Sequence, residues 1–289
     1  MKITKAVIPV AGLGLRFLPA TKAQPKEVIP IIDKPAIQYV VEEAVRAGIT
    51  DILFITGRGK RAIEDYFDKS YEVEEELKKK GKHEQVELLE NIVNLANFYY
   101  IRQKEVKGLG HAIYQAKSFV GSEHFAVLLG DDIMSADSPG LKELCRIQQL
   151  KKSNVVGVKK VAIEKISKYG VVAGKMATDG VLEVEDLVEK PKPEDAPSDL
   201  AIIGRYIISP GIFKILEDLP PGVNGEIQLT DALRILNKTE KIFAYEIPGK
   251  RFDIGDKVGF LQASIELALE HDEIGGEIRD YLKDLVGKI

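Results

Sequence analysis

Residues 8–30, with the sequence IPVAGLGLRFLPATKAQPKEVIP, constrain the fold of this chain more than any other stretch. An apolar strand runs into a turn at Gly12 and Gly14, and Arg16 and Lys26 follow among three prolines. Glycines let backbone N–H groups approach phosphate oxygens, and fixed cations supply the counter-charge. Because prolines stiffen the segment, Lys26 is held in place. The stretch predicts a polyanion-binding loop after a buried strand; the alternative is a solvated basic loop without a ligand.

Two common nucleotide motifs are absent from the chain. The dinucleotide fingerprint G-x-G-x-x-G needs a third small residue, but Phe17 stands at that position. The Walker loop G-x-x-x-x-G-K-[ST] occurs nowhere in the 289 residues. These absences count against an NAD oxidoreductase and against a P-loop phosphotransferase.

The charge balance limits the classes of partner. The chain has 41 basic and 45 acidic residues and a net charge of -4, so it offers no broad basic face for nucleic acid. The single Cys145 cannot form an internal disulfide, which fits a reducing cytosol. We expect no signal peptide and no membrane span, since no apolar run approaches about 18 residues. A cytoplasmic protein that binds phosphate locally is the expectation.

Strand and helix patterns alternate along the first half of the chain, which predicts a doubly wound parallel sheet. The expected strands are residues 6–10, 52–56, 98–102, 125–129, 155–161, 200–208 and 241–247, and the expected helices begin near Pro35, Arg61, Gly108, Leu141, Ser209 and Ala232. Residues 71–94 are expected to form one or two surface helices. A hairpin with its turn at Asp179-Gly180 adds antiparallel pairing. We therefore predict an α/β, Rossmann-like fold with a mixed sheet.

Two further helices are predicted at the C-terminus, at residues 258–270 and 274–286. The second carries an apolar stripe that includes Ile278, Tyr281 and Leu285. Such a stripe packs either on the core of its own chain or on a second subunit. Packing on its own core is the default expectation.

Polar residues stand where two of the predicted strands end. Gln103 follows one strand and precedes a glycine turn at Gly108, and its amide offers the donor and acceptor that pair with one edge of uracil or thymine. Asp131 and Asp132 follow another strand, where carboxylates are well placed for Mg²⁺. The alternatives are an ordinary strand-end Gln and a turn or helix cap. His111 is expected at a helix start, not as a metal ligand.

The second half of the chain carries candidates for a sugar phosphate. Glu189 can accept hydrogen bonds from hydroxyl groups while Lys190 faces a phosphate, although the pair alone also suits an exposed turn. Glu226 either contacts the sugar or neutralises nearby cations. Asp253 follows the last strand, where its own chemistry suits the cap of the next helix.

Residues 11–27, AGLGLRFLPATKAQPKE, resemble the signature of the sugar-nucleotide pyrophosphorylases, G-x-G-x-R-x-x-P-x-T-x-x-x-P-K. The runs GRGKRAIEDYFD at residues 57–68 and GEIQLTDA at residues 225–232 resemble the uridylyltransferase branch of that family. One position departs from the pattern, because Leu15 stands where the family usually has Thr. The resemblance implies a single nucleotidyltransferase domain, with a nucleotide-binding part at about 1–160, a sugar-phosphate-binding part at about 161–257 and C-terminal helices at about 258–289.

The resemblance also implies roles for individual residues. The implied sets are Arg16, Lys26 and Lys190 for catalysis; Ala11, Gly12, Gly14, Gln103 and Gly108 for the nucleotide; Gly170, Glu189, Gly204 and Glu226 for the sugar; and Asp131 and Asp253 for Mg²⁺. The implied reaction converts UTP and glucose 1-phosphate to UDP-glucose and pyrophosphate, in a homodimer or homotetramer. The alternatives are a glucose-1-phosphate thymidylyltransferase, since thymine differs from uracil by one methyl group, and a non-catalytic regulatory relative, which Leu15 favours.

Overall fold

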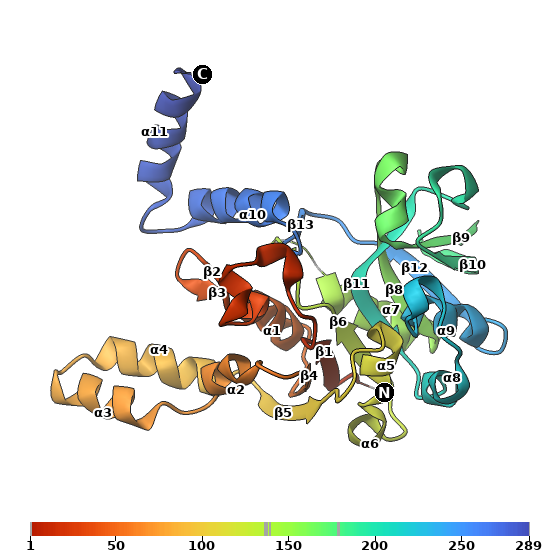
Figure 1. Ribbon diagram of the computed structural model, residues 1–289, viewed down its shortest axis with the longest axis horizontal. Helices are drawn as coiled ribbons and strands as arrows, with labels where there is room; N and C mark the ends of the chain where they lie inside the picture. Colours follow the sequence, from red (N-terminus) through yellow and green to blue (C-terminus); the bar gives the residue numbers. More distant parts are fainter. Residues whose placement is uncertain (1, 136–137, 139, 178–179, 289) are drawn as a thin grey trace.

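A nine-stranded mixed sheet forms the centre of the molecule in the computed structural model, which describes residues 2–135, 138, 140–177 and 180–288 (Figure 1). The strand order is β5-β4-β1-β6-β11-β8-β12-β10-β9. Four strands at one side run parallel to one another: β5 (Asn97–Arg102), β4 (Asp51–Thr56), β1 (Lys5–Pro9) and β6 (Phe125–Leu128). This half is the parallel sheet that the alternating pattern predicts.

Antiparallel pairing enters at β11, which pairs with both β6 and β8. The strands of this half are β8 (Asn154–Lys160), β9 (Gly170–Met176), β10 (Leu182–Glu189), β11 (Leu200–Ile208) and β12 (Ile242–Glu246). β9 and β10 form the predicted hairpin, of which the turn residue Asp179 lies outside the described residues. The mixed sheet of the predicted fold class is thereby confirmed.

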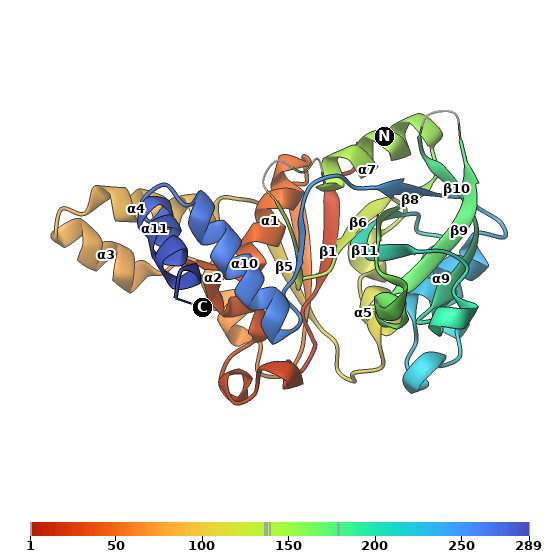
Figure 2. The ribbon, with the colours of Figure 1, turned by 90° about the horizontal axis from the view of Figure 1, so that it is seen from above.

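Helices cover both faces of this sheet, because the strands carry apolar side chains on both faces. One core cluster includes side chains of α1 (Ala36–Arg46), α2 (Arg61–Phe67) and α7 (Gly140–Lys151). The other includes side chains of α5 (Leu109–Tyr114), α6 (Lys117–Val120), α8 (Ile212–Asp218) and α9 (Leu229–Leu236). Figure 2 shows α7 and α9 at different sides of the sheet.

Three helix boundaries differ from the sequence expectations. The helix expected to run from Gly108 to Phe119 is broken into α5 and α6. The predicted cap at Ser209-Pro210 is wrong: Gly211 is the N-cap of α8, and the buried Ser209 hydroxyl has no hydrogen-bond partner among the described residues. α9 begins at Leu229, ahead of the expected Ala232.

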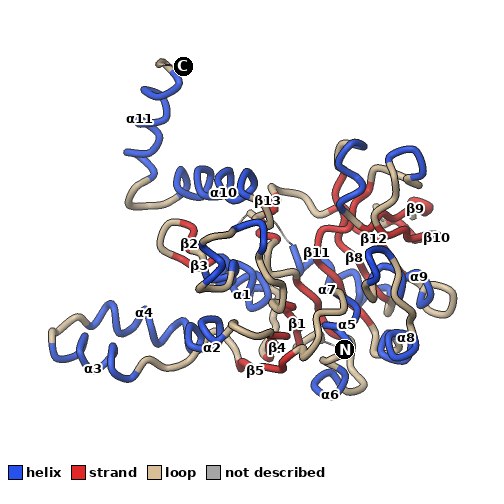
Figure 3. Tube along the Cα trace, viewed as in Figure 1, coloured by secondary structure: helices blue, strands red, loops and turns tan. Residues whose placement is uncertain are grey.

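Two helical segments extend from the sheet (Figures 1 and 3). One is the pair α3 (Tyr71–Lys79) and α4 (His83–Val93), and the other is α10 (Lys257–Glu270) followed by α11 (Gly275–Val286). The expected packing of α11 on its own core is wrong, since Tyr281 is 61% exposed and Leu285 is also exposed. Among the described helices, none is long and apolar enough to cross a membrane.

Arg205 joins the sheet to α1 and to the loop after β6. Its side chain is fully buried, and its Nη2 lies 2.7 Å from Glu43 Oε2 and 2.6 Å from the carbonyl oxygen of Asp132.

We expect Arg205→Met to lower the free energy of unfolding by about 3–5 kcal/mol, because Glu43 would remain buried without its counter-charge. Urea denaturation would measure this loss. Arg234→Ala, which removes an exposed ion pair with Asp186, should cost at most about 1 kcal/mol.

Candidate active site

A cavity of about 260 Å³ collects seven of the residues predicted from the sequence. They are Arg16, Asp131, Gly170, Glu189, Lys190, Glu226 and Asp253. The residues come from strand ends and from the segments beside them in both halves of the molecule, the usual location for a ligand in an open α/β sheet. Residues widely separated in the sequence therefore surround one space.

A two-stranded sheet brings the two predicted metal carboxylates together. β7 (Asp132–Met134) pairs antiparallel with β13 (Arg251–Asp253), and the register sets Asp253 opposite Asp132. Beyond the ladder, the Ile254 N–H donates to the Asp131 carbonyl oxygen at 2.9 Å. A Cβ built on Gly255 would lie 3.1 Å from Asp131 Oδ2 and 3.0 Å from Asp253 Oδ1, so both carboxylates border the same small space.

The alternative role of Asp253 as a helix cap is taken by another residue. The carboxylate of Asp256 accepts hydrogen bonds from the N–H groups of Val258 and Gly259, which makes Asp256 the N-cap of α10. Asp253 Oδ1 instead accepts a hydrogen bond from the Gly255 N–H at 3.0 Å.

Lys26 forms an ion pair with Asp131 behind the cavity, with its Nζ 2.6 Å from Oδ2. Burial acts to lower the pKa of Lys26, but the carboxylates of Asp131, Glu27 and Asp253 together outweigh it and the pKa is raised. Burial acts to raise the pKa of Asp131, but the Lys26 ammonium, a backbone hydrogen bond and the Arg251 guanidinium together outweigh it and the pKa is lowered. Both residues are therefore charged at neutral pH, and the ammonium lies beside the candidate metal position.

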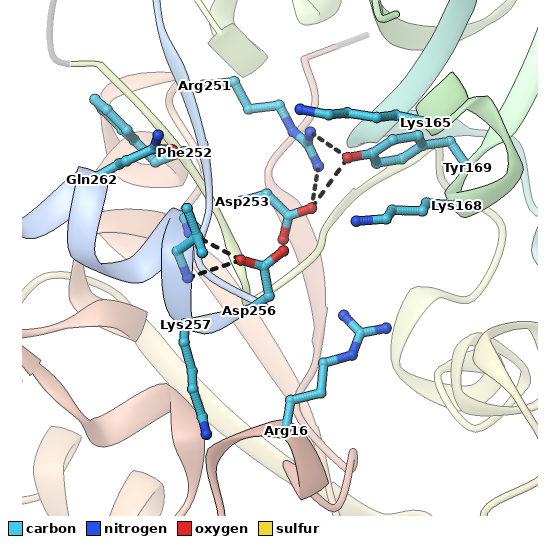
Figure 4. A pocket seen from close by; sticks show the side chains of 12 residues that line it. Arg16, Lys165, Lys168, Tyr169, Arg251, Phe252, Asp253, Asp256, Lys257 and Gln262 are labelled. Atoms are coloured by element: carbon cyan, nitrogen blue, oxygen red, sulfur yellow. Dashed lines mark hydrogen bonds and ion pairs between the residues drawn. The ribbon is translucent and has the colours of Figure 1, made fainter. Parts of the chain in front are cut away.

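Two residues without a predicted role, Arg251 and Tyr169, support this arrangement (Figure 4). Arg251 forms a close ion pair with the buried Asp132, and its Nη2 lies 3.6 Å from Asp253 Oδ2. Burial raises the pKa of Asp132, whereas Arg251 acts in the opposite direction. The Tyr169 hydroxyl accepts from Arg251 at 3.3 Å and donates to Asp253 Oδ2 at 3.2 Å. The only sequence signal for Arg251 and Tyr169 is that they lie close to Asp253 and Gly170 in the chain.

The sugar-phosphate candidates lie together at the end of the β9–β10 hairpin. Glu189 pairs with Gly170 in the ladder, and Glu189 Oε1 lies 3.2 Å from Lys190 Nζ. The Glu189 side chain is only 9% exposed, which disfavours an ordinary solvated pair. A Cβ on Gly170 would lie 2.5 Å from Thr230 Oγ1, so a larger residue would crowd this wall. Glu226 accepts from Gln228 Nε2 at 3.1 Å beside the same cavity.

The candidate base-binding residue Gln103 is buried at the end of β5. Its Nε2 donates to the Gly108 carbonyl oxygen at 3.3 Å and lies 2.9 Å from His111 Nδ1. Among the described residues, none donates to its Oε1, so the acceptor end of the amide is available to a ligand. Gly108 has φ +101, and a Cβ there would lie 2.7 Å from the Ile227 carbonyl oxygen. Only glycine fits this close approach.

Several predicted residues do not line the cavity itself. Gly14 has φ +67 and packs against Thr21 and Lys26, and a Cβ on Gly12 would meet no atom within 4 Å. Ala11 is buried against Gly57. Gly204 lies beneath the site, where a Cβ would be 2.6 Å from Asp132 Oδ2.

A second cavity, of about 720 Å³, adjoins the first and shares Arg16, Tyr169 and Asp253 with it (Figure 4). Basic side chains line it from four segments: Arg16, then Lys165 and Lys168 of η4 (Ile163–Lys168), Arg251 of β13, and Lys257 of α10. This second cavity has more cations than carboxylates and adjoins the carboxylates of the first, an arrangement that suits a polyphosphate with a divalent metal.

The donor set fits Mg²⁺. This ion commonly uses one or two protein carboxylates and completes its shell with water and substrate phosphates. Asp131 and Asp253 supply two carboxylates here, and no group of three or more His, Cys, Asp or Glu suited to a metal occurs among the described residues. Two carboxylates are thus enough to bind a Mg²⁺ ion whose remaining ligands are water and the phosphates of the substrate.

Comparison with known proteins agrees with this geometry. The nucleotidyl transferase family model matches residues 5–270. The chain is 53% identical to the UTP–glucose-1-phosphate uridylyltransferase YngB of Bacillus subtilis, covering 99% of this chain and 96% of that protein. A second uridylyltransferase of Bacillus subtilis is 50% identical, over 99% of this chain and 98% of its own length.

Solved structures give the same result. A UDP-glucose pyrophosphorylase complexed with UDP-glucose matches with a TM-score of 0.85 at 47% identity, over 93% of this chain and all of that one. A UTP-bound enzyme of the same kind from Acinetobacter baumannii matches with a TM-score of 0.88 at 39% identity, over 98% and 99% of the two chains. This chain therefore belongs to the nucleotidyl transferase family and, within it, to the UTP–glucose-1-phosphate uridylyltransferases.

Proposed function

We propose that the chain transfers the uridylyl group of UTP to α-D-glucose 1-phosphate, giving UDP-glucose and pyrophosphate, with Asp131 and Asp253 holding Mg²⁺. The observation that carries this assignment is one cavity lined by both carboxylates, by Arg16 and by the Glu189–Lys190 pair. Relatives at about 50% identity carry the name of this activity. The boundaries of the nucleotide-binding and sugar-binding parts stay predictions.

The sugar phosphate oxygen attacks the α-phosphorus of UTP in line, and pyrophosphate leaves on the opposite side. Lys190 aligns the attacking phosphate, while Arg16 and Lys26 stabilise the charge on the leaving pyrophosphate. Glu189 accepts hydrogen bonds from sugar hydroxyl groups. A protein base is not required, because the attacking phosphate is already anionic at neutral pH. When bound, Mg²⁺ would neutralise phosphate charge beside the two carboxylates.

The uracil base is assigned to Gln103 and the backbone at Gly108. Gln103 Oε1 accepts a hydrogen bond from the base, and the amide orientation is held by Gly108 and His111. Because thymine presents the same edge and adds one methyl group, discrimination against dTTP is expected to be modest, about 1–3 kcal/mol.

Acid pH is expected to weaken UTP binding through His111. Burial, aided by Lys107, lowers the pKa of His111, so the ring is neutral at pH 7 and its Nδ1 can accept from Gln103 Nε2. As the pH falls through this lowered pKa, protonation removes the acceptor and the KM for UTP should rise, with a smaller change in kcat. KM measured over about pH 5–8 tests this. His111→Gln, which has no titrating group, should give a flatter KM profile.

We also propose that the chain is cytoplasmic and forms a homodimer or homotetramer. The exposed stripe on α11, with Tyr281 and Leu285, offers an apolar surface for a second subunit. Light scattering that returns the 32.0 kDa mass of one chain would contradict the oligomer.

The decisive experiment measures pyrophosphate release with glucose 1-phosphate and Mg²⁺, using UTP and dTTP side by side, each with and without EDTA. Metal-dependent release that favours UTP is the expected result. Equal rates with the two nucleotides would indicate a dual-specificity enzyme. Binding of UDP-glucose without any release would favour the non-catalytic regulatory relative.

A further inference from the structure

A buried ion pair lies directly behind the phosphate loop. Lys60 Nζ is 2.8 Å from Glu27 Oε2, and the two side chains are only 6% and 2% exposed. Glu27 belongs to the short helix η3 (Lys26–Val28), and Lys60 is the N-cap residue of α2. The pair therefore joins the signature loop to a helix that contributes no residue to either cavity described above.

Glu27 touches both segments that meet at the candidate metal position. It follows Lys26 in the chain, and Lys26 forms the ion pair with Asp131. Its Cγ would lie 3.6 Å from a Cβ built on Gly130, the residue before Asp131. Anchoring Glu27 therefore restrains the backbone at Lys26 and the turn that carries Asp131.

Stability alone does not account for this pair. Removing two charges from water is costly, and a buried ion pair is often no more stabilising than two apolar side chains of similar volume. A fixed pair instead gives one defined geometry, since Lys60 can neutralise Glu27 only in this arrangement of the loop and α2. No residue of the run 57–68 takes part in the proposed reaction. The ion pair gives this run a structural role, because its Lys60 fixes the position of Glu27.

We propose that Lys60 is a positioning residue: through its buried ion pair with Glu27, it holds the Lys26 ammonium where the leaving pyrophosphate develops charge. This inference rests on the proposed function for the role of Lys26. A displacement of about 1 Å in a catalytic group can cost about 10²-fold in rate. Loss of the pair should accordingly lower kcat while the fold persists.

The test uses Glu27→Met/Lys60→Met, which replaces both charges with apolar side chains of similar size and leaves no buried charge unpaired. We expect a melting temperature close to that of the wild-type chain and a kcat reduced by about 10- to 100-fold. Arg61→Ala removes the neighbouring, 86% exposed cation of α2 and should leave kcat unchanged.

A double-mutant cycle with Lys26→Ala separates positioning from a general loss of structure. If Lys60 acts through Lys26, the paired methionine variant should lower kcat by less than about twofold in the Lys26→Ala background. An equal loss in both backgrounds, or a wild-type kcat in the Glu27→Met/Lys60→Met variant, would overturn the proposal.

The double-mutant cycle can also be carried out on UTP binding. Calorimetry measures the Kd for UTP in each variant, and this measurement does not depend on turnover. A wild-type chain that binds UTP but releases no pyrophosphate would contradict the proposed function, while the Kd cycle would still decide whether Lys60 acts through Lys26. Weaker UTP binding in the paired variant, with no further weakening in the Lys26→Ala background, supports the positioning role. Additive losses of affinity contradict it.

Discussion

Replacing Lys26 by alanine is expected to lower kcat by about 10²–10³-fold, the usual cost of removing one preorganised charge donor. Lys26 Nζ already lies 2.6 Å from the Asp131 carboxylate, and its raised pKa keeps it charged throughout the physiological range. The ammonium group is therefore fixed before substrate binds. Initial rates of pyrophosphate release at saturating UTP and glucose 1-phosphate would measure the loss.

A matched control is available in the same loop. Lys22 ends the short helix η2 (Ala20–Lys22), is exposed, and lines neither cavity. Lys22→Ala should leave kcat within about twofold of the wild-type value, because an exposed cation in water is strongly screened. A Lys26→Ala variant with near-normal turnover would show that the leaving pyrophosphate does not depend on this residue.

Loss of the Asp253 carboxylate should have an effect of similar or greater size. Asp253→Asn keeps the shape of the side chain but removes one of the two charges available to Mg²⁺. We expect kcat to fall by at least about 10³-fold at a fixed Mg²⁺ concentration, because metal stabilisation of phosphate charge contributes several kcal/mol. Titrating pyrophosphate release with Mg²⁺ should also show that half-saturation requires more metal.

Metal binding can be followed without turnover. Mn²⁺ gives a spin-resonance signal when free, so its uptake by the wild-type and Asp253→Asn chains can be compared in the presence of UTP. Weaker Mn²⁺ uptake by the variant is expected. Asp195→Asn, an exposed carboxylate of η5 (Pro193–Asp195), is the control and should bind as the wild-type chain does. Unchanged uptake in Asp253→Asn would remove Asp253 from the metal site.

The sequence predicts the positions of polar site residues well where an apolar strand leads directly to them. Asp131 and Gln103 follow β6 and β5, whose runs of apolar residues are unambiguous. The pairing of β7 with β13 is different, because each strand has only three residues and their partners are far apart in the chain. Such short strands carry no usable periodicity, so the ion pair between Arg251 and Asp132 emerges only from the register. The hydrogen bond from Tyr169 to Asp253 emerges only from the folded structure.

Other differences depend on contacts that the spacing of residues does not specify. A Ser-Pro pair before an apolar run is typical of a helix start, but the Ser209 hydroxyl caps no N–H group and α8 begins after Gly211. The stripe on α11 has the spacing of a core-facing helix, yet spacing does not reveal which surface it faces. The acceptor end of Gln103 likewise depends on neighbours that no sequence pattern specifies.

The ion pair between Lys26 and Asp131 should couple the binding of the metal to the binding of UTP. A metal that takes Asp131 leaves Lys26 without its counter-charge, and a phosphate that takes Lys26 does the same to Asp131. When both ligands arrive, each charge gains a new partner. Each ligand should therefore raise the affinity for the other by the same factor, as linkage requires. Calorimetric titration of UTP with and without metal would measure this reciprocity, and equal affinities would show that the two ligands bind independently.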